Sequence, residues 1–246
     1  MLIALFADIH ANRQAFEACL ARAREAGAER FVLLGDYVGY GADPEWAVTT
    51  VMALVEEGAI AVRGNHDEAI GNPRETMNVE AQIAIEWTRR QLGAAERRFL
   101  DRLPLAHDED GRLYVHADAS EPAAWHYVMS SSDAVRSLMA TSAAITFCGH
   151  VHRPALYTLS AAGKVTAFTP TADTPIQLLP TRQWLAVLGS VGQPRDRNPA
   201  AAYALLDTGR RELTFCRVAY DIEKAAAAIR AKGLPPFLAE RLFAGR

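Results

Sequence analysis

The chain has 246 residues, of which 50% are hydrophobic and 22% charged, a composition typical of a globular protein that excludes disordered, collagen-like and coiled-coil chains. The formal net charge is only −3, so we expect no stable binding to nucleic acid or to a membrane surface. With no apolar run near the roughly 18 residues of a membrane span, no secretory leader and three widely spaced cysteines, a cytoplasmic location is expected.

The first 65 residues alternate strand and helix signals. Strands are predicted over residues 2–7, 31–34 and 59–62, and helices over residues 12–26 and 43–57, the second of which opens on an Asp-Pro pair. This βαβαβ order predicts parallel strands joined by crossover helices. In such sheets the functional residues gather beyond the carboxyl ends of the strands.

The later segments predict three more helices and a second sheet. The helices are expected over residues 77–102, 221–232 and 235–245. Within the first of them, Val79, Ile83 and Trp87 recur at four-residue spacing and are expected to pack against the core. Short strands separated by turn residues are predicted over residues 113–115, 145–148, 155–159, 164–168, 184–188, 203–206 and 213–218. The result is a two-sheet α/β sandwich, expected to form one domain over residues 1–246.

Five of the seven histidines lie in polar clusters at the ends of predicted strands. Asp8 and His10 follow the first strand two residues apart, so their side chains face the same way and can bind one metal. The other clusters contain Asp36, the run Asn65-His66-Asp67, His116, and the pair His150 and His152. Each signal alone is weak, because a single polar residue at a strand end is more often a cap. Together these oxygen and nitrogen ligands favour a hard or borderline divalent metal.

In order and spacing, the clusters resemble the five motifs of the calcineurin-like metallophosphoesterases. The motifs are Asp8-x-His10, Gly35-Asp36-x-x-x-x-Gly41, Gly64-Asn65-His66-Asp67, the strand-end His116 and Gly149-His150-x-His152. Gly189 to Arg195 is similar to the tail signature of a small prokaryotic branch with phosphodiesterases and phosphatases, so the resemblance covers residues 8–195. It implies a four-layer αββα sandwich of two mixed sheets flanked by helices.

The resemblance also implies a site for two divalent ions. One ion would bind Asp8, His10 and His152, the other would bind Asn65, His116 and His150, and Asp36 would bridge them. The abundance of histidine ligands favours Mn, Fe, Zn, Ni or Co over Mg. A hydroxide between the ions would attack phosphorus in line, and His66 would protonate the leaving oxygen. The alternative for His66 is a supporting role beside the ligands.

The second motif departs from the Gly-Asp-x-x-Asp-Arg-Gly pattern of the family's phosphoprotein phosphatases. Gly39 replaces the carboxylate that steadies the catalytic histidine, and Tyr40 replaces the arginine that binds phosphate. Activity on phosphoproteins therefore loses support. Asp67 and Asp43 are candidate replacements for the missing carboxylate.

The substrate-binding candidates are Arg195, Arg63 and Tyr40. A guanidinium matches phosphate oxygens with two parallel hydrogen bonds, although a surface ion pair explains Arg63 equally well. The run Trp125-His126-Tyr127 is a candidate wall for the pocket, and packing at the edge of the core is the favoured alternative for it.

The function that the sequence favours is a phosphoester hydrolase with two divalent metal ions, acting on a phosphodiester or a small phosphomonoester. The alternatives are a phosphoprotein phosphatase and a non-catalytic, metal-binding scaffold of the same fold. The only partner expected is a small phosphate-ester substrate. The sequence leaves open the physiological substrate, the native metals and the oligomeric state.

Overall fold

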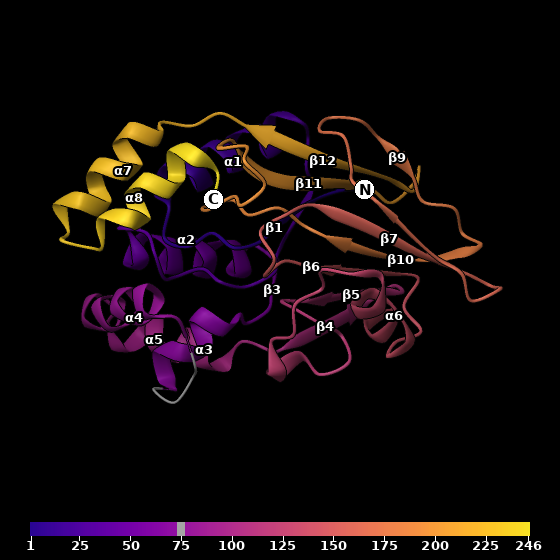
Figure 1. The fold of residues 1–246 in the computed structure, drawn as a ribbon, viewed down its shortest axis with the longest axis horizontal. Coiled ribbons are helices and arrows are strands. Elements are labelled where there is room, and N and C mark those ends of the chain that lie inside the picture. Colours follow the sequence, from indigo (N-terminus) through magenta and orange to yellow (C-terminus); the bar gives the residue numbers. More distant parts are fainter. Residues whose placement is uncertain (73–76) are drawn as a thin grey trace.

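Two six-stranded sheets lie face to face in the computed structural model, which describes residues 1–72 and 77–246 (Figure 1). The first sheet has the order β3 (Ile60–Ala61), β2 (Arg30–Leu33), β1 (Leu2–Phe6), β11 (Ala201–Asp207), β12 (Glu212–Val218) and β9 (Ile176–Gln177). The second has the order β4 (Ala106–Glu109), β5 (Arg112–Val115), β6 (Ile145–Cys148), β10 (Arg182–Val187), β7 (Ala155–Ser160) and β8 (Val165–Phe168).

Both sheets are mixed. Strands β1, β2 and β3 run parallel, as the βαβαβ pattern predicts, and β11 pairs antiparallel with β1. In the second sheet, β5, β6 and β10 run parallel, and β7 pairs antiparallel with β10. The parallel strands of each sheet therefore end at one edge, where their following loops can meet.

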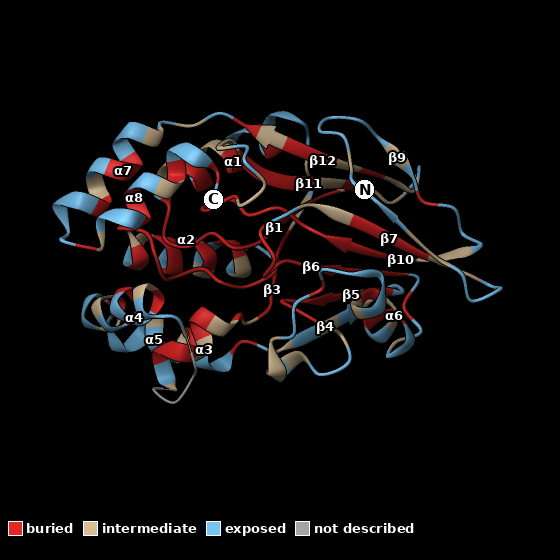
Figure 2. Cartoon of the chain, viewed as in Figure 1, coloured by how far each residue is buried: buried red, intermediate tan, exposed pale blue. Residues whose placement is uncertain are grey.

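Strand β1 shows why two layers of core form. Its side chains alternate, so that Ile3 and Leu5 enter the cluster between the sheets, whereas Ala4 and Phe6 face the helices. Phe147 of β6 meets Ile3 and Leu5 in the cluster between the sheets. Burial is accordingly concentrated in the strands and on the inner faces of the helices (Figure 2).

Helices cover the outer faces of both sheets. The helices are α1 (Arg13–Glu25), α2 (Pro44–Glu56), α3 (Asn65–Gly71), α4 (Val79–Gln91), α5 (Ala94–Arg102), α6 (Ser131–Met139), α7 (Ile222–Ala231) and α8 (Pro236–Ala244), with a 3-10 turn at Pro122–Ala124. Helix α1 packs on β11 and β12, α6 packs on the second sheet, and α7 packs on α1 and α8. This confirms the predicted four-layer sandwich. Within the described ranges, no helix is long and apolar enough to cross a membrane.

The predicted helix over residues 77–102 is two helices, and its packing face was predicted wrongly. Leu92 takes an extended conformation between α4 and α5, which ends the first helix. Val79 and Ile83 are 66% and 45% exposed, and only the half-buried Trp87 contacts the core among the three expected residues. Helix α4 instead buries a face that includes Ala81 and Ile85, and it packs mainly against α3 and α2.

Some elements are absent from the sequence prediction. Helix α6 begins with a reciprocal capping box between Ser130 and Asp133, which is a recognisable sequence signal. Strand β4 is half exposed and reads Ala-His-Asp-Glu, a composition that carries no strand signal. Pairing with β5 creates this strand.

Candidate metal centre

The candidate ligands meet at the carboxyl ends of the parallel strands of both sheets. They follow β1 (Asp8 and His10), β2 (Asp36), β3 (Asn65), β5 (His116) and β6 (His150 and His152). The possible ligand atoms form two groups, and within each group all the atoms lie within 4.8 Å of one another. The first group comes from Asp8, His10, Asp36 and His152, and the second comes from Asp36, His116 and His150. All of these residues are buried, and Asp36 belongs to both groups. Asn65 lies beside the second group, with its Oδ1 3.2 Å from His116 Nε2.

Asp36 lies at the centre of this arrangement. Its Oδ2 is 3.4 Å from His116 Nε2, 3.7 Å from His10 Nε2 and 4.0 Å from His66 Nε2. Its Oδ1 accepts the backbone N–H of His66 at 2.8 Å. One carboxylate oxygen is therefore fixed by the first turn of α3, and the other faces both histidine groups.

Three histidine rings are oriented by backbone carbonyls. The Nδ1 atoms of His10, His116 and His152 lie 3.0, 2.7 and 2.6 Å from the carbonyl oxygens of Val38, Leu34 and Gln193. Donation from Nδ1 leaves the Nε2 atom of each ring as the one that faces inward. His10 Nε2 lies 3.1 Å from His152 Nε2, and His116 Nε2 lies 3.1 Å from His150 Nδ1.

These nitrogen pairs fit a cation. Two facing lone pairs at such a separation repel each other unless a proton or a metal ion lies against both. An imidazole and carboxylate set of this kind suits a borderline divalent metal. The donor set therefore fits the ions that the motif pattern implies.

Burial and mutual charge set the protonation of the metal-free site. Burial lowers the pKa of His150 to about 3 and that of His10 well below its usual range. Burial acts the same way on His116, but the charge of Asp36 outweighs it and raises the pKa of His116 to about 9. Burial also opposes ionisation of Asp36, yet the charges of His116 and His66 hold the pKa of Asp36 well below its usual range. A metal ion bound here therefore competes with a proton on His116.

Five of the candidate ligands have left-handed backbone conformations. Asp8, His10, Asp36, His150 and His152 have φ between 48° and 65°, a region that residues other than glycine seldom adopt. Hydrogen bonds between the loops hold this conformation; for example, the N–H of His10 donates to the carbonyl of Asp36 at 2.9 Å. Strained backbone retained at one place in a fold is typical of a functional site.

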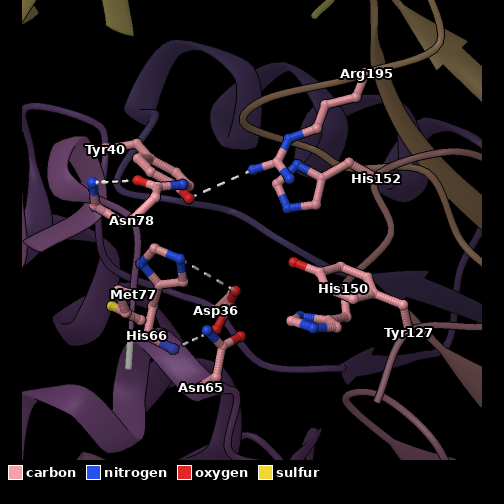
Figure 3. A pocket seen from close by; sticks show the side chains of 11 residues that line it. Asp36, Tyr40, Asn65, His66, Met77, Asn78, Tyr127, His150, His152 and Arg195 are labelled. Atoms are coloured by element: carbon pink, nitrogen blue, oxygen red, sulfur yellow. Dashed lines mark hydrogen bonds and ion pairs between the residues drawn. The ribbon is translucent and has the colours of Figure 1, made fainter. Parts of the chain in front are cut away.

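A cavity of about 110 Å³ opens over these ligands (Figure 3). Arg195 and Tyr40 line one side, and the Nη2 of Arg195 donates to Gln193 Oε1 at 3.0 Å and lies 3.5 Å from the Tyr40 hydroxyl. Tyr127 lines the other side and stacks on His150 with ring centroids 4.1 Å apart. The cavity is therefore wide enough for a phosphate group, with a cation and aromatic rings around it.

Two of the other wall candidates take different positions. Trp125 packs edge-on against His116, with ring centroids 5.9 Å apart, and so supports that ring. His126 is half exposed and lies 3.6 Å from Glu121, away from the residues that line the cavity. Met77 and Asn78, at the amino end of α4, line the cavity but were missed. Asn78 caps that helix, so its sequence signal indicated a helix start and not a pocket.

Arg63 does not line the cavity, so the structure does not bring this candidate phosphate clamp together with Arg195 and Tyr40. Its guanidinium lies 3.1 Å from Glu68 and donates to the carbonyl of Asp101 at 3.0 Å. The side chain is 18% exposed and fixes α3 to the end of α5. The alternative interpretation of Arg63, an ion pair, describes its position.

His66 has no orienting carboxylate at Nδ1. This buried atom has no hydrogen-bond partner among the described residues. Asp67 does not supply one, because its two oxygens accept the backbone N–H groups of Asp36, Tyr37 and Gly64. Asp43 occupies the N-cap position of α2. Aromatic rings hold the His66 ring instead, with the centroids of Tyr40 and His10 4.6 and 4.7 Å away.

The geometry has counterparts among known proteins. The family model described as a calcineurin-like phosphoesterase superfamily domain matches residues 1–211. The uncharacterized protein MJ0912 of Methanocaldococcus jannaschii is 34% identical over 251 residues, which cover 100% of this chain and 98% of that protein. A metallophosphoesterase from Sphaerobacter thermophilus superposes with a TM-score of 0.88 at 33% identity, covering 100% and 99% of the two chains. Hypothetical protein PH1004 from Pyrococcus horikoshii shares the fold, with a TM-score of 0.80 at 20% identity and coverage of 100% and 98%.

Proposed function

Because the chain belongs to the calcineurin-like phosphoesterase superfamily, we propose that it hydrolyses a small phosphate ester with two divalent metal ions bound at the carboxyl ends of its strands. The observation that carries this proposal is the shared position of Asp36 between two buried groups of ligand atoms. Asp8, His10 and His152 would hold one ion, Asn65, His116 and His150 would hold the other, and Asp36 would be shared by the two groups. Mn, Fe, Zn, Ni and Co suit these ligands better than Mg.

When bound, the two ions supply positive charge to the phosphate oxygens and activate the attacking water. The chain's own residues then position the ester. Arg195 reaches the cavity from the loop after β10 and binds phosphate in place of the arginine that the second motif lacks. The hydroxyl of Tyr40, which stands at the motif position of that arginine, holds the guanidinium in place.

His66 protonates the leaving oxygen. Its ring lines the cavity but belongs to neither ligand group. Burial lowers the pKa of His66 to about 4 in the metal-free site, and the negative charge of a bound phosphate acts in the opposite direction.

We therefore expect His66→Ala to leave metal content unchanged and to slow esters with poor leaving groups by at least about 100-fold. Activated 4-nitrophenyl esters should slow much less, because their leaving oxygen needs no proton. The measurement is kcat for a series of esters of increasing leaving-group pKa. An equal loss for every ester in the series would contradict the proton-donor role.

The two arginine candidates allow a matched test of phosphate binding. Arg195→Met should lower kcat/KM by at least about tenfold, because a charge-assisted hydrogen bond to phosphate is lost. Arg63→Met should change kcat/KM by less than about threefold, because the partly exposed ion pair with Glu68 contributes little. A larger loss for Arg63→Met than for Arg195→Met would contradict the assignment.

The loss of the motif carboxylate at Gly39 and the small cavity support a small ester over a phosphoprotein. The direct test is the ratio of turnover on bis(4-nitrophenyl) phosphate to turnover on 4-nitrophenyl phosphate, measured on protein stripped of metal and reloaded with Mn²⁺. A ratio well above one indicates a phosphodiesterase, and a ratio well below one a phosphatase. Absence of turnover on both would overturn the proposal in favour of a non-catalytic scaffold.

We also propose a cytoplasmic location, in line with three buried, free cysteines.

A further inference from the structure

A second guanidinium lies beside the proposed phosphate site. Arg241, in the last turn of α8, has its Cζ 6.0 Å from the ring centroid of Tyr40, and Arg195 has its Cζ 5.8 Å from the same centroid. Arg241 comes from a part of the chain that lies beyond the family match. Helix α8 reaches the site because Leu238 and Ala239 pack in one cluster with Tyr40 and Ala81.

Within residues 1–72 and 77–246, no aspartate or glutamate oxygen lies within 4.0 Å of either guanidinium. Arg241 Nε donates to the main-chain oxygen of Arg246, and the Cζ of Arg241 lies 5.1 Å from the ring centroid of Phe237. Burial and the charge of Arg195 lower the pKa of Arg241 to about 10, and Tyr40 and Glu80 act in the opposite direction. The closest acids of the site, Asp8 and Asp36, are ligands in the proposed function.

Two like charges held on one tyrosine ring repel each other, and an anion between them would relieve that repulsion. The cavity over the ligands, with a volume of about 110 Å³, has room for one phosphate group beside Arg195. Arg241 does not line that cavity. Its charge is therefore placed for a group that extends past Tyr40.

We propose that Arg241, with Arg195, forms a second anion subsite around Tyr40, which selects phosphate esters that carry a further phosphate besides the one hydrolysed. This inference rests on the proposed function, because it takes the cavity over the metal ligands as the reacting site. The substrate class is then a phosphorylated ester with two phosphates, such as a nucleoside phosphate with a second phosphate on its sugar.

The test compares two esters with the same reacting group, the 4-nitrophenyl ester of thymidine 5′-phosphate with and without a 3′-phosphate. The wild-type, Mn²⁺-loaded chain should prefer the 3′-phosphorylated ester in kcat/KM by at least about tenfold, and Arg241→Gln should reduce this preference to less than about threefold. Arg241→Lys should keep most of the preference, because it retains the charge. Arg230→Gln, which removes an exposed cation from α7 of the same helical pair, should leave it unchanged.

Binding measured without turnover separates this inference from the proposed function. Calorimetry on the full chain should show thymidine 3′,5′-bisphosphate binding more tightly than thymidine 5′-phosphate, and Arg241→Gln should remove the difference. If neither ester is hydrolysed but this binding difference is found, the proposed function fails and the subsite stands. Equal binding of the two nucleotides by the wild-type chain, or an equal loss for both in Arg241→Gln, would overturn the subsite. Thermal unfolding of each variant identifies any general loss of folding.

Discussion

Asp36→Asn is expected to lower kcat/KM by at least about 100-fold and to reduce the bound metal from two ions to at most one. Changing a group that merely supports a metal ligand costs about 10–100-fold, and Asp36 is shared by both ligand groups. The substitution should not unfold the chain, because asparagine keeps the oxygen that accepts the His66 N–H at 2.8 Å. Metal analysis of the purified protein and steady-state kinetics on one ester measure the two effects.

Asp43→Asn provides the control with the same chemical change. Asp43 precedes α2, and its side chain makes no capping hydrogen bond. The control should keep full metal content and near wild-type kinetics. Wild-type turnover by a fully metal-loaded Asp36→Asn sample would contradict the shared-ligand assignment.

Restoring the missing motif carboxylate with Gly39→Asp is expected to lower activity by at least about 100-fold, the contribution of a general acid. The motif alone predicts the opposite, because it places an aspartate at this position. In this fold, a Cβ on Gly39 would lie 2.2 Å from His66 Nδ1, so the ring would have to leave its place between Tyr40 and His10. Gly39 also has φ of +86°, which costs a side-chain-bearing residue about 1–2 kcal/mol of stability.

Gly58→Asp separates these two effects. Gly58 has φ of +100°, and nothing lies within 4 Å of a Cβ built on it. It should therefore show only the loss of melting temperature that the backbone strain causes, and no loss of kcat. If Gly39→Asp matches or exceeds wild-type activity, His66 does not need its present position, and the proton-donor role loses its structural support.

The ends of the strands and the polar residues that follow them could be predicted, because both depend on the pattern of apolar and polar residues over a short stretch of sequence. Alternation in β1 predicts which side chains face each layer, and Asp8 and His10 lie two and four residues beyond its end. Parallel pairing of β1 with β2 then brings Asp36 to the same edge. The left-handed backbone of these residues could not be predicted, since contacts between loops impose it.

Long-range packing decided the parts that sequence could not supply. Arg63 and Arg195 both carry a guanidinium, but only the loop after β10 turns its arginine into the cavity. In the sequence, Gly39 indicated only that the motif carboxylate is missing. The structure shows that a side chain at this position would occupy the space of the His66 ring. Arg241 gave no signal, because its place beside Tyr40 depends on the cluster that joins α8 to Tyr40 and Ala81.

The measurement that tests the central claim most directly is a Mn²⁺ titration of the metal-free chain, with the electron paramagnetic resonance spectrum recorded at saturation. Because both ligand groups include Asp36, the account predicts two ions per chain with magnetically coupled spins, and loss of the coupling in Asp36→Asn. One ion per chain at saturation, or two ions without coupling, would contradict a metal pair that shares Asp36.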